Sequence, residues 1–393
     1  MDFFPFFLSF IFIILHLLGQ RFVQGEVDIQ RHHHHHKEPI TKLFVFGDSY
    51  ADTGNIKRGF APSWKHPYGV TFPGKPAGRF SDGRILVDEI VGFISLLAYD
   101  MSIYSGVTML FLLQKMYVII YLMHAIAAKY LKVKSPASYR IRKHLAPHHL
   151  KNGMSFAFGG TGVFETLNPG PNMTTQINFF QKAIQDKVFT ASDIRKSVAL
   201  VSVAGNDYTR YTVTNGSIQG LPSFILSVVN QTIRNVIRIK ELGVKKVIIS
   251  NLQPVGCLPS VTASSSFKEC NETSNNLLVA YHNTLLTEAV TKLNQQLNDN
   301  SSLPFIVLDL YDSFMSVLKH PSTHNIKNEL EPCCVGVSSK YFCGSVVEKV
   351  KKYTVCENPK SAFFWDLVHP TDAGWRAVYT RLRITNAFKE IHY

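Results

Sequence analysis

The chain has 393 residues, of which 46% are hydrophobic, and its formal net charge is +13 at pH 7. This length and composition allow a sizeable core in one large α/β domain or in two average domains. The excess of basic residues favours acidic partners, such as anionic cell-wall polysaccharide in loose association or membrane headgroups. Because Lys and Arg are scattered along the chain rather than gathered into one arm or stripe, nucleic-acid binding is not expected.

The N-terminal segment predicts a secretory signal. Residues 3–18 (FFPFFLSFIFIILHLL) are almost wholly apolar, and small residues follow around Gly25, although no basic residue precedes the run. A membrane anchor is the alternative, but Pro5 and the shortness of the run disfavour a stable span. We therefore expect a signal peptide over residues 1–25, followed by a His-rich polar linker over residues 26–40.

Cysteines and glycosylation sequons support the same compartment. The six cysteines lie late in the chain and fit no paired zinc-ligand spacing, so we expect disulfides, with the pairing left open. They are Cys257, Cys270, Cys333, Cys334, Cys343 and Cys356. Five Asn-x-Ser/Thr sequons predict glycosylation at Asn172, Asn215, Asn230, Asn271 and Asn300. The tract His32–His36 is interpreted as part of the linker, so no metal site is predicted. A secreted, extracellular protein is expected, which in a plant means the cell wall or apoplast.

Four short apolar runs, rich in β-branched residues, are typical of buried parallel strands. They span residues 42–46, 198–204, 246–250 and 305–310. Segments of helical periodicity lie at residues 223–242 and 274–298, and a last helix is expected from Thr371 or Asp372 to about Phe388. Strands alternating with helices predict a doubly wound α/β sheet flanked by helices, in a single domain over residues 41–393.

Polar residues follow two of these runs closely. Ser49 comes after the first run, in LFVFGDSYADTGN, and Asn206 comes after the second. Sites in doubly wound sheets form at the carboxyl ends of strands, so both positions favour function over a simple turn. A serine needs a base to take its proton and a third group to orient that base. Asp366 and His369, three residues apart in FWDLVHPT, have a spacing that suits these roles, although helix capping is the alternative for Asp366.

The sequence contains no G-x-S-x-G, which excludes the usual nucleophile-elbow hydrolases. Five ordered blocks instead resemble those of the plant GDSL esterase/lipases, within the SGNH hydrolase superfamily. These blocks are FVFGDSYADTGN (44–55), KPAGRFSDGR (75–84), NGMSFAFGGTGVF (152–164), SVAGNDY (202–208) and FFWDLVHPT (363–371). The stretch LGVKKVIISNLQPVGCLP (242–259) is similar in character, so the resemblance runs from about residue 41 to the C-terminus.

The resemblance implies a flavodoxin-like sheet of SGNH type and an enzyme that hydrolyses lipid or small acyl esters through an acyl-enzyme. Ser49 would be the nucleophile, His369 the general base and Asp366 the group that orients it. The oxyanion hole would comprise the Ser49 N–H, the Gly159 N–H and the Asn206 amide, with the adjacent Gly160 as the alternative glycine. No cofactor is implied. An acyltransferase with the same residues and a catalytically silent wall-associated glycoprotein are the alternatives.

Other polar and aromatic residues of these blocks favour structural roles. We expect Asp52 and Asn55 to hold the loop after Ser49 through bonds to the backbone. Arg79 and Asp82 suit an ion pair or a turn at least as well as a cleft. Tyr208 and the aromatic run 363–365 suit core packing better than contact with an acyl chain.

One segment departs from the family pattern. Residues 91–126 are apolar and rich in aromatic side chains, and they interrupt an otherwise continuous helical pattern. A membrane-associated helix is one interpretation, which Gln114 and Lys115 disfavour because charge at a helix centre is costly in a bilayer. An insertion packed on the core is a second. A translated, retained intron is the third and favoured interpretation, because such an apolar insert suits a surface loop poorly.

Overall fold

The computed structural model of the chain describes residues 40–92, 94, 135–203, 205–297, 303–385, 388, 390 and 391. Several sequence predictions lie outside these residues. They are the signal peptide (1–25), the linker up to residue 39, Asn300, and the 91–126 segment apart from residues 91, 92 and 94.

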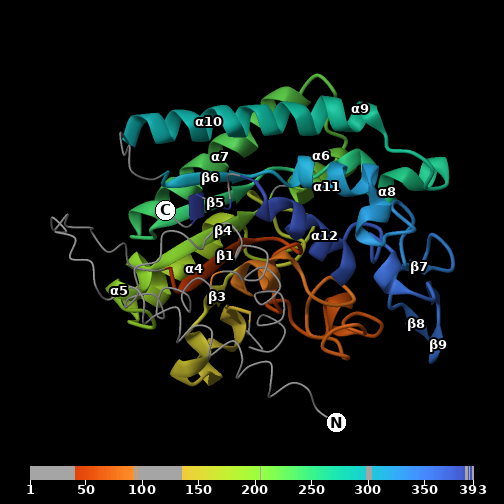
Figure 1. Cartoon of the computed structure of the whole chain (residues 1–393), viewed down its shortest axis with the longest axis horizontal. Helices are drawn as coiled ribbons and strands as arrows, with labels where there is room; N and C mark the ends of the chain where they lie inside the picture. Colours follow the sequence, from red (N-terminus) through yellow and green to blue (C-terminus); the bar gives the residue numbers. More distant parts are fainter. Residues whose placement is uncertain are drawn as a thin grey trace, which may run out of the picture. The chain divides into compact units, whose positions relative to one another are not determined.

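Six parallel strands form the central sheet, in the order β2-β3-β1-β4-β5-β6 (Figure 1). They are β1 (Lys42–Gly47), β2 (Ala137–Ser138), β3 (Gly153–Ser155), β4 (Ser197–Ser202), β5 (Lys246–Ser250) and β6 (Phe305–Leu308). From β1 the chain crosses to β3 on one side and then returns to β4 on the other. With the short β2 set aside, this is the flavodoxin-like order, whose topological switch point lies between β1 and β4. The predicted doubly wound α/β fold is confirmed.

All four predicted strands are present, with small differences at their ends. β4 ends at Ser202 rather than at residue 204. β6 ends at Leu308 because Asp309 begins the next helix, where its carboxylate accepts the Asp312 N–H at 2.9 Å. β2 and β3 were not predicted, since strands of two and three residues are too short to show a periodic pattern.

Alternate side chains of β1 supply two separate cores, one on each face of the sheet. Leu43 and Val45 pack on the face covered by α11 (Leu310–Lys319), α12 (Asp372–Arg383) and the helical segment 86–92. Phe44 and Phe46 pack on the opposite face. That face is covered by α4 (Met173–Gln185), α7 (Leu221–Glu241) and α10 (Tyr281–Leu297), of which α7 and α10 lie side by side (Figure 1).

The predicted helices are present, and two differ in extent. The segment predicted as one helix over 274–298 consists of α9 (Glu272–Ser274), a π-helical turn (Asn275–Ala280) and α10. The last helix begins as expected, because Thr371 Oγ1 accepts the Gly374 N–H at 2.9 Å, but α12 ends at Arg383 rather than near Phe388. The shorter helices are α5 (Ala191–Arg195), α6 (Gly205–Val213) and α8 (Pro259–Thr262).

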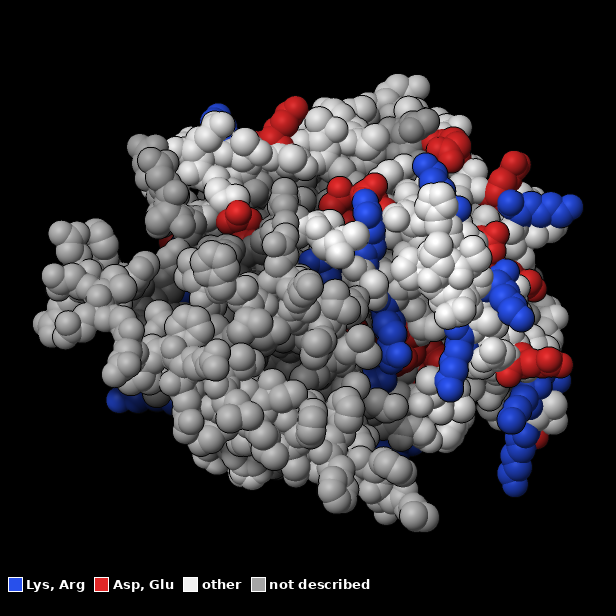
Figure 2. Space-filling view, viewed as in Figure 1, with Lys and Arg blue, Asp and Glu red and all other residues white. Residues whose placement is uncertain are grey.

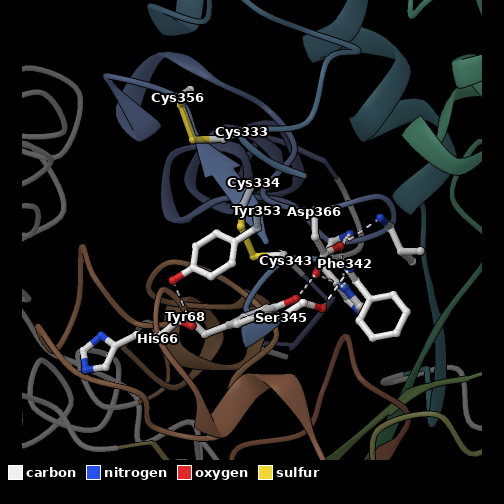
Figure 3. Close-up of a disulfide and its surroundings, with 12 residues drawn as sticks. His66, Tyr68, Cys333, Cys334, Phe342, Cys343, Ser345, Tyr353, Cys356 and Asp366 are labelled. Atoms are coloured by element: carbon white, nitrogen blue, oxygen red, sulfur yellow. Dashed lines mark hydrogen bonds and ion pairs between the residues drawn. A yellow bond between two sulfur atoms is a disulfide. The ribbon is translucent and has the colours of Figure 1, made fainter. Parts of the chain in front are cut away.

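All six cysteines form disulfides, as expected, in the pairs Cys257–Cys270, Cys333–Cys356 and Cys334–Cys343. The last two bonds lie in a small cluster with Tyr68, Tyr353 and Trp365. Figure 3 shows the two bonds beside the two tyrosines. In this cluster β7 (Cys334–Gly336) pairs antiparallel with β10 (Tyr353–Val355), and a hairpin of β8 (Val346–Val347) and β9 (Val350–Lys351) lies between them in sequence.

The surface features bear on the predicted compartment. Among the sequons, Asn215, Asn230 and Asn271 are exposed. Asn172 is half-buried, and its side chain caps α4 by accepting the Thr175 N–H at 3.0 Å. None of the helices within the described ranges combines the length and the apolar character needed to cross a bilayer.

Candidate active site

The turn that carries Ser49 is fixed by the backbone of Gly47 at the end of β1. Gly47 has φ +147°, and a Cβ atom there would lie 1.9 Å from the Ser202 carbonyl oxygen of β4, so only glycine fits. Gln176 of α4 makes two hydrogen bonds to this residue. Its Oε1 accepts the Gly47 N–H at 2.8 Å, and its Nε2 donates to the Gly47 carbonyl at 2.9 Å. Ser49 is thereby held at the carboxyl edge of the sheet.

Ser49, His369 and Asp366 form one hydrogen-bonded chain. Ser49 Oγ lies 2.7 Å from His369 Nε2, across a sequence separation of 320 residues. His369 Nδ1 lies 2.8 Å from Asp366 Oδ1 and 2.9 Å from Oδ2. Each of the three residues is less than 10% exposed. The geometry is that of a serine, a base that can take its proton, and a carboxylate that selects the tautomer of that base.

The Asp366 carboxylate is surrounded by donors. It accepts the N–H groups of Val368 and His369 at 2.9 and 2.8 Å, and the Tyr68 hydroxyl at 2.8 Å. Burial alone would raise the pKa of Asp366, but the interaction with His369 and these backbone bonds outweigh it and hold the pKa below its usual value. Asp366 is therefore ionised at neutral pH. The capping role that competed for Asp366 belongs to Thr371.

Aromatic rings enclose the imidazole of His369. The ring of Phe80 lies 4.9 Å from it between centroids, and that of Tyr50 lies 5.7 Å away in an edge-on arrangement. The Tyr50 hydroxyl also donates to the Val368 carbonyl at 2.8 Å, which ties the turn after β1 to the loop that carries His369. These contacts restrict the imidazole to the orientation that faces Ser49.

Candidate oxyanion donors surround Ser49, but the two glycines differ. The Gly159 N–H donates to Asp52 Oδ2 at 3.0 Å, so it is already used within the protein. Neither the Ser49 N–H nor the Gly160 N–H has a hydrogen-bond partner within the described part of the chain. Asn206 donates one amide hydrogen to the Thr161 carbonyl at 2.9 Å, which orients the amide and leaves its second hydrogen for another acceptor.

Buried carboxyl groups lie beside Ser49. Burial raises the pKa of Asp48 to about 7, against the opposing effects of the Tyr50 N–H bond and of His369. Burial also raises the pKa of Asp207 to about 6, although its carboxylate accepts the N–H groups of Val163 and Phe164, each at 2.9 Å. Asp207 thus anchors the loop that follows the two glycines.

Two cavities open beside the triad. The larger, of about 580 Å³, is lined by Asp48, Ser49, Asn206 and Tyr208. Its apolar walls include Val203, Leu221, Leu252, Val255, Leu258 and Leu277. The smaller, of about 170 Å³, is lined by Asp366, His369, Phe80 and Phe342 among others. Tyr208 packs in the core, as favoured, at 4% exposure, and it also borders the larger cavity; its hydroxyl bonds His282 Nδ1 at 2.6 Å.

The residues expected to be structural hold the loops around the site. Asp52 accepts the N–H groups of Gly54 and Asn55 at 2.7 and 2.6 Å, and Asn55 Nδ2 donates to the carbonyls of Ser155 and Ala157, each at 2.8 Å. Arg79 pairs with Asp88 at 2.8 Å rather than with Asp82. Asp82 instead accepts the Asp372 N–H at 2.7 Å. The aromatic run Phe363, Phe364 and Trp365 is fully buried in the core.

Two residues near the triad were not predicted. Tyr68, which bonds Asp366, lies in a loop of no recognisable pattern, almost 300 residues before its partner. Phe80 lies within the quoted block KPAGRFSDGR, but an aromatic residue in a loop gives no signal that it packs on a histidine. Both contacts depend on tertiary structure alone.

A doubly wound sheet with this serine, histidine and aspartate at its carboxyl edge defines a serine-hydrolase type of site. A family model described as GDSL-like Lipase/Acylhydrolase matches residues 43–382. Two GDSL esterase/lipases of Arabidopsis thaliana are similar to the chain. One is 48% identical over 384 residues, covering 96% of this chain and 95% of the relative, and the other is 43% identical over 377 residues, covering 94% and 95%. Acetylajmalan esterase 2 of Rauvolfia serpentina is 26% identical over 387 residues, covering 90% of this chain and 92% of that protein.

The chain therefore belongs to the GDSL lipase/acylhydrolase family and is a carboxylic-ester hydrolase.

Proposed function

We propose that the protein hydrolyses carboxylic esters through an acyl-enzyme on Ser49. The 2.7 Å contact between Ser49 Oγ and His369 Nε2 is the observation that carries the proposal. His369 takes the Ser49 proton as Oγ attacks the carbonyl carbon, and Asp366 stabilises the imidazolium that results. His369 then gives the proton to the leaving alcohol oxygen. Water, activated by the same imidazole, releases the acid and restores Ser49.

The oxyanion formed in each step is assigned to three donors. They are the Ser49 N–H, a glycine N–H of the 159–160 pair and the Asn206 amide. The Gly159 N–H, which was the favoured donor, already donates to Asp52. Gly160 is therefore the better candidate for the glycine N–H that binds the oxyanion. Removing one donor from an oxyanion hole typically costs about 3 kcal/mol of transition-state stabilisation.

A secretory location is part of the same proposal. It is supported by the three disulfides, which form and persist in oxidising compartments, and by the exposure of Asn215, Asn230 and Asn271. On the face seen in Figure 2, basic and acidic side chains of the described residues are interspersed rather than gathered into one stripe. The described part of that face therefore carries no basic stripe of the kind that binds nucleic acid, and the formal net charge of +13 is what supports loose association with acidic cell-wall polysaccharide.

Hydrolysis of a short-chain chromogenic ester by the wild type and by Ser49→Ala tests the proposal. We expect the variant to lose almost all activity while remaining folded, since the loss of one hydrogen bond lowers the free energy of unfolding by only about 1 kcal/mol. Equal rates for the two proteins would refute it. With an added alcohol, transfer that outpaces hydrolysis would identify an acyltransferase instead, and an inactive wild type would favour the silent glycoprotein.

A further inference from the structure

Two separate cavities flank the triad, and different members of the triad line them. Ser49 and Asn206 line the larger cavity, of about 580 Å³. His369 and Asp366 line the smaller one, of about 170 Å³. Val368 borders both, so the two cavities meet at the loop between Asp366 and His369.

The reaction assigned above decides which part of an ester each cavity suits. When Ser49 Oγ bonds the carbonyl carbon, its proton passes to His369 Nε2. When the tetrahedral intermediate collapses, the bond from that carbon to the alcohol oxygen breaks, and the Nε2 proton goes to that oxygen. The alcohol oxygen must therefore lie within hydrogen-bond reach of His369, while the acyl carbon stays on Ser49. The alcohol belongs on the His369 side and the acyl chain on the Ser49 side.

The chemistry of the smaller cavity restricts this alcohol. Its walls include Pro62, Phe80, Val335, Phe342 and Leu367, and neither Lys nor Arg contributes to its described lining. A phosphate would therefore have no cation to neutralise it. Its single carboxylate, Asp366, already has five polar contacts, which come from the Tyr68 hydroxyl, the Val368 and His369 N–H groups, and His369 Nδ1 to both carboxylate oxygens. An anionic group placed there would lose its hydration without compensation and would face the ionised Asp366.

A cationic alcohol meets further obstacles on the same wall. His369 carries a positive charge while it holds the proton of Ser49, so it repels a neighbouring ammonium group. The aromatic faces are also engaged within the protein. Phe80 packs on the imidazole of His369 with centroids 4.9 Å apart, and Tyr68 meets Phe80 and Trp365 edge-on. They are thus not arranged as an open cage for a quaternary ammonium ion.

A disulfide holds one wall of this cavity in place. Cys334 and Cys343 both line it, and their bond closes the loop that carries Phe342 (Figure 3). The strand β7 that begins at Cys334 is paired with β10, and the Phe342 N–H donates to Ser345 Oγ at 3.0 Å. Phe342 is 67% exposed, which places its ring at the edge of the cavity rather than in the core.

We propose that the cavity of about 170 Å³ beside His369 is the alcohol subsite, and that it selects esters of compact, uncharged, apolar alcohols while the larger cavity holds the acyl chain. This inference rests on the proposed acyl-enzyme mechanism at Ser49. Phe342 is assigned as a specificity residue for the alcohol, and Leu277, which lines the larger cavity and is 56% exposed, is its counterpart for the acyl chain.

Two esters of the same acid test the charge preference of the subsite. Butyrylcholine and 3,3-dimethylbutyl butyrate have alcohol parts of nearly the same shape, and only the first carries a charge. With the full-length chain we expect kcat/KM for the neutral ester to exceed that for the choline ester by about 100-fold, because the ammonium group would give up hydration beside the protonated His369 and find no open aromatic cage. Equal values, or a faster choline ester, would overturn the assignment of an uncharged alcohol.

Two variants test which cavity holds which part of the substrate. Phe342→Ala is expected to raise kcat/KM for butyrates of bulky neutral alcohols about tenfold relative to methyl butyrate, and to leave the profile of methyl esters of increasing acyl length unchanged. Leu277→Ala is a matched truncation of an exposed side chain. It is expected to change the profile of methyl esters of increasing acyl length and to leave the ratio of bulky-alcohol butyrates to methyl butyrate unchanged. If Phe342→Ala changes the acyl profile, or neither series responds, the inference fails. A wild type inactive on every ester would instead overturn the proposed function itself.

Discussion

The Tyr68→Phe variant removes one hydroxyl and keeps the ring that packs in the disulfide cluster. The lost interaction is the 2.8 Å hydrogen bond from Tyr68 to Asp366 Oδ2, in a buried setting (Figure 3). Hydrogen bonds to charged groups contribute about 1.5–3 kcal/mol. Asp366 keeps the N–H groups of Val368 and His369 and the imidazole itself, so it stays ionised and its link to His369 survives.

We therefore expect a moderate loss of activity rather than inactivation. A loss at the low end of that range, about 1.5 kcal/mol in the transition state, corresponds to roughly a tenfold lower kcat. The assay is steady-state hydrolysis of a short-chain ester, with urea unfolding measured on the same preparation. The free energy of unfolding is expected to fall by a similar amount, because the hydroxyl bond is lost from the folded state alone.

Tyr353→Phe is the matched control for this prediction. Tyr353 lies in the same cluster, and its hydroxyl donates to the His66 carbonyl at 3.4 Å rather than to the triad (Figure 3). Its removal is expected to leave kcat within about twofold, since this bond is long and reaches no reacting group. Activity of Tyr68→Phe within twofold of wild type, or an equal loss in Tyr353→Phe, would refute a positioning role for Tyr68.

Two further predictions concern acidic groups of the site. Asp366→Asn is expected to lower kcat by about 10⁴-fold in a folded protein, because the amide does not hold the imidazole in the required tautomer; a loss below tenfold, measured on the same ester, would contradict the assignment. Asp48→Asn is expected to flatten the dependence of stability on pH. Burial raises the pKa of Asp48 to about 7 from an ordinary 3.8, so its contribution to stability is complete below pH 4 and is lost as pH rises through 7. The full shift corresponds to about 4 kcal/mol, and urea midpoints of wild type and variant that run parallel from pH 5 to 8 would refute it.

The central sheet was predictable because its strands are buried on both faces. Continuous apolar runs such as residues 42–46 and 246–250 leave few other structures open to them, and helical periodicity between them fixes the doubly wound class. The ends of elements were less predictable, since they depend on local contacts. The break before α10 is an example, because a four-residue spacing of apolar side chains runs without interruption from Leu277, in the π-helical turn Asn275–Ala280, to Leu285 and Leu293 in α10.

The site also has a part that the sequence predicted and a part that it did not. Ser49, Asn206 and the pair Asp366 and His369 have recognisable sequence surroundings. Strand order brings Ser49 and Asn206 to one edge of the sheet, and the loop before α12 carries the pair to Ser49. The sequence does not reveal whether an individual N–H group already has a hydrogen-bond partner. Nothing in the sequence shows that the Gly159 amide bonds Asp52 or that Tyr68 supports Asp366, since both contacts join loops that meet only in the folded chain.

The nucleophile is the central claim, and covalent labelling tests it most directly. A fluorophosphonate probe reacts with an activated serine, and mass spectrometry then locates the adduct in the full-length chain. We predict one adduct, on the peptide that contains Ser49, and none in Ser49→Ala. An adduct on another serine, or an unlabelled wild type that still hydrolyses esters, would contradict the account.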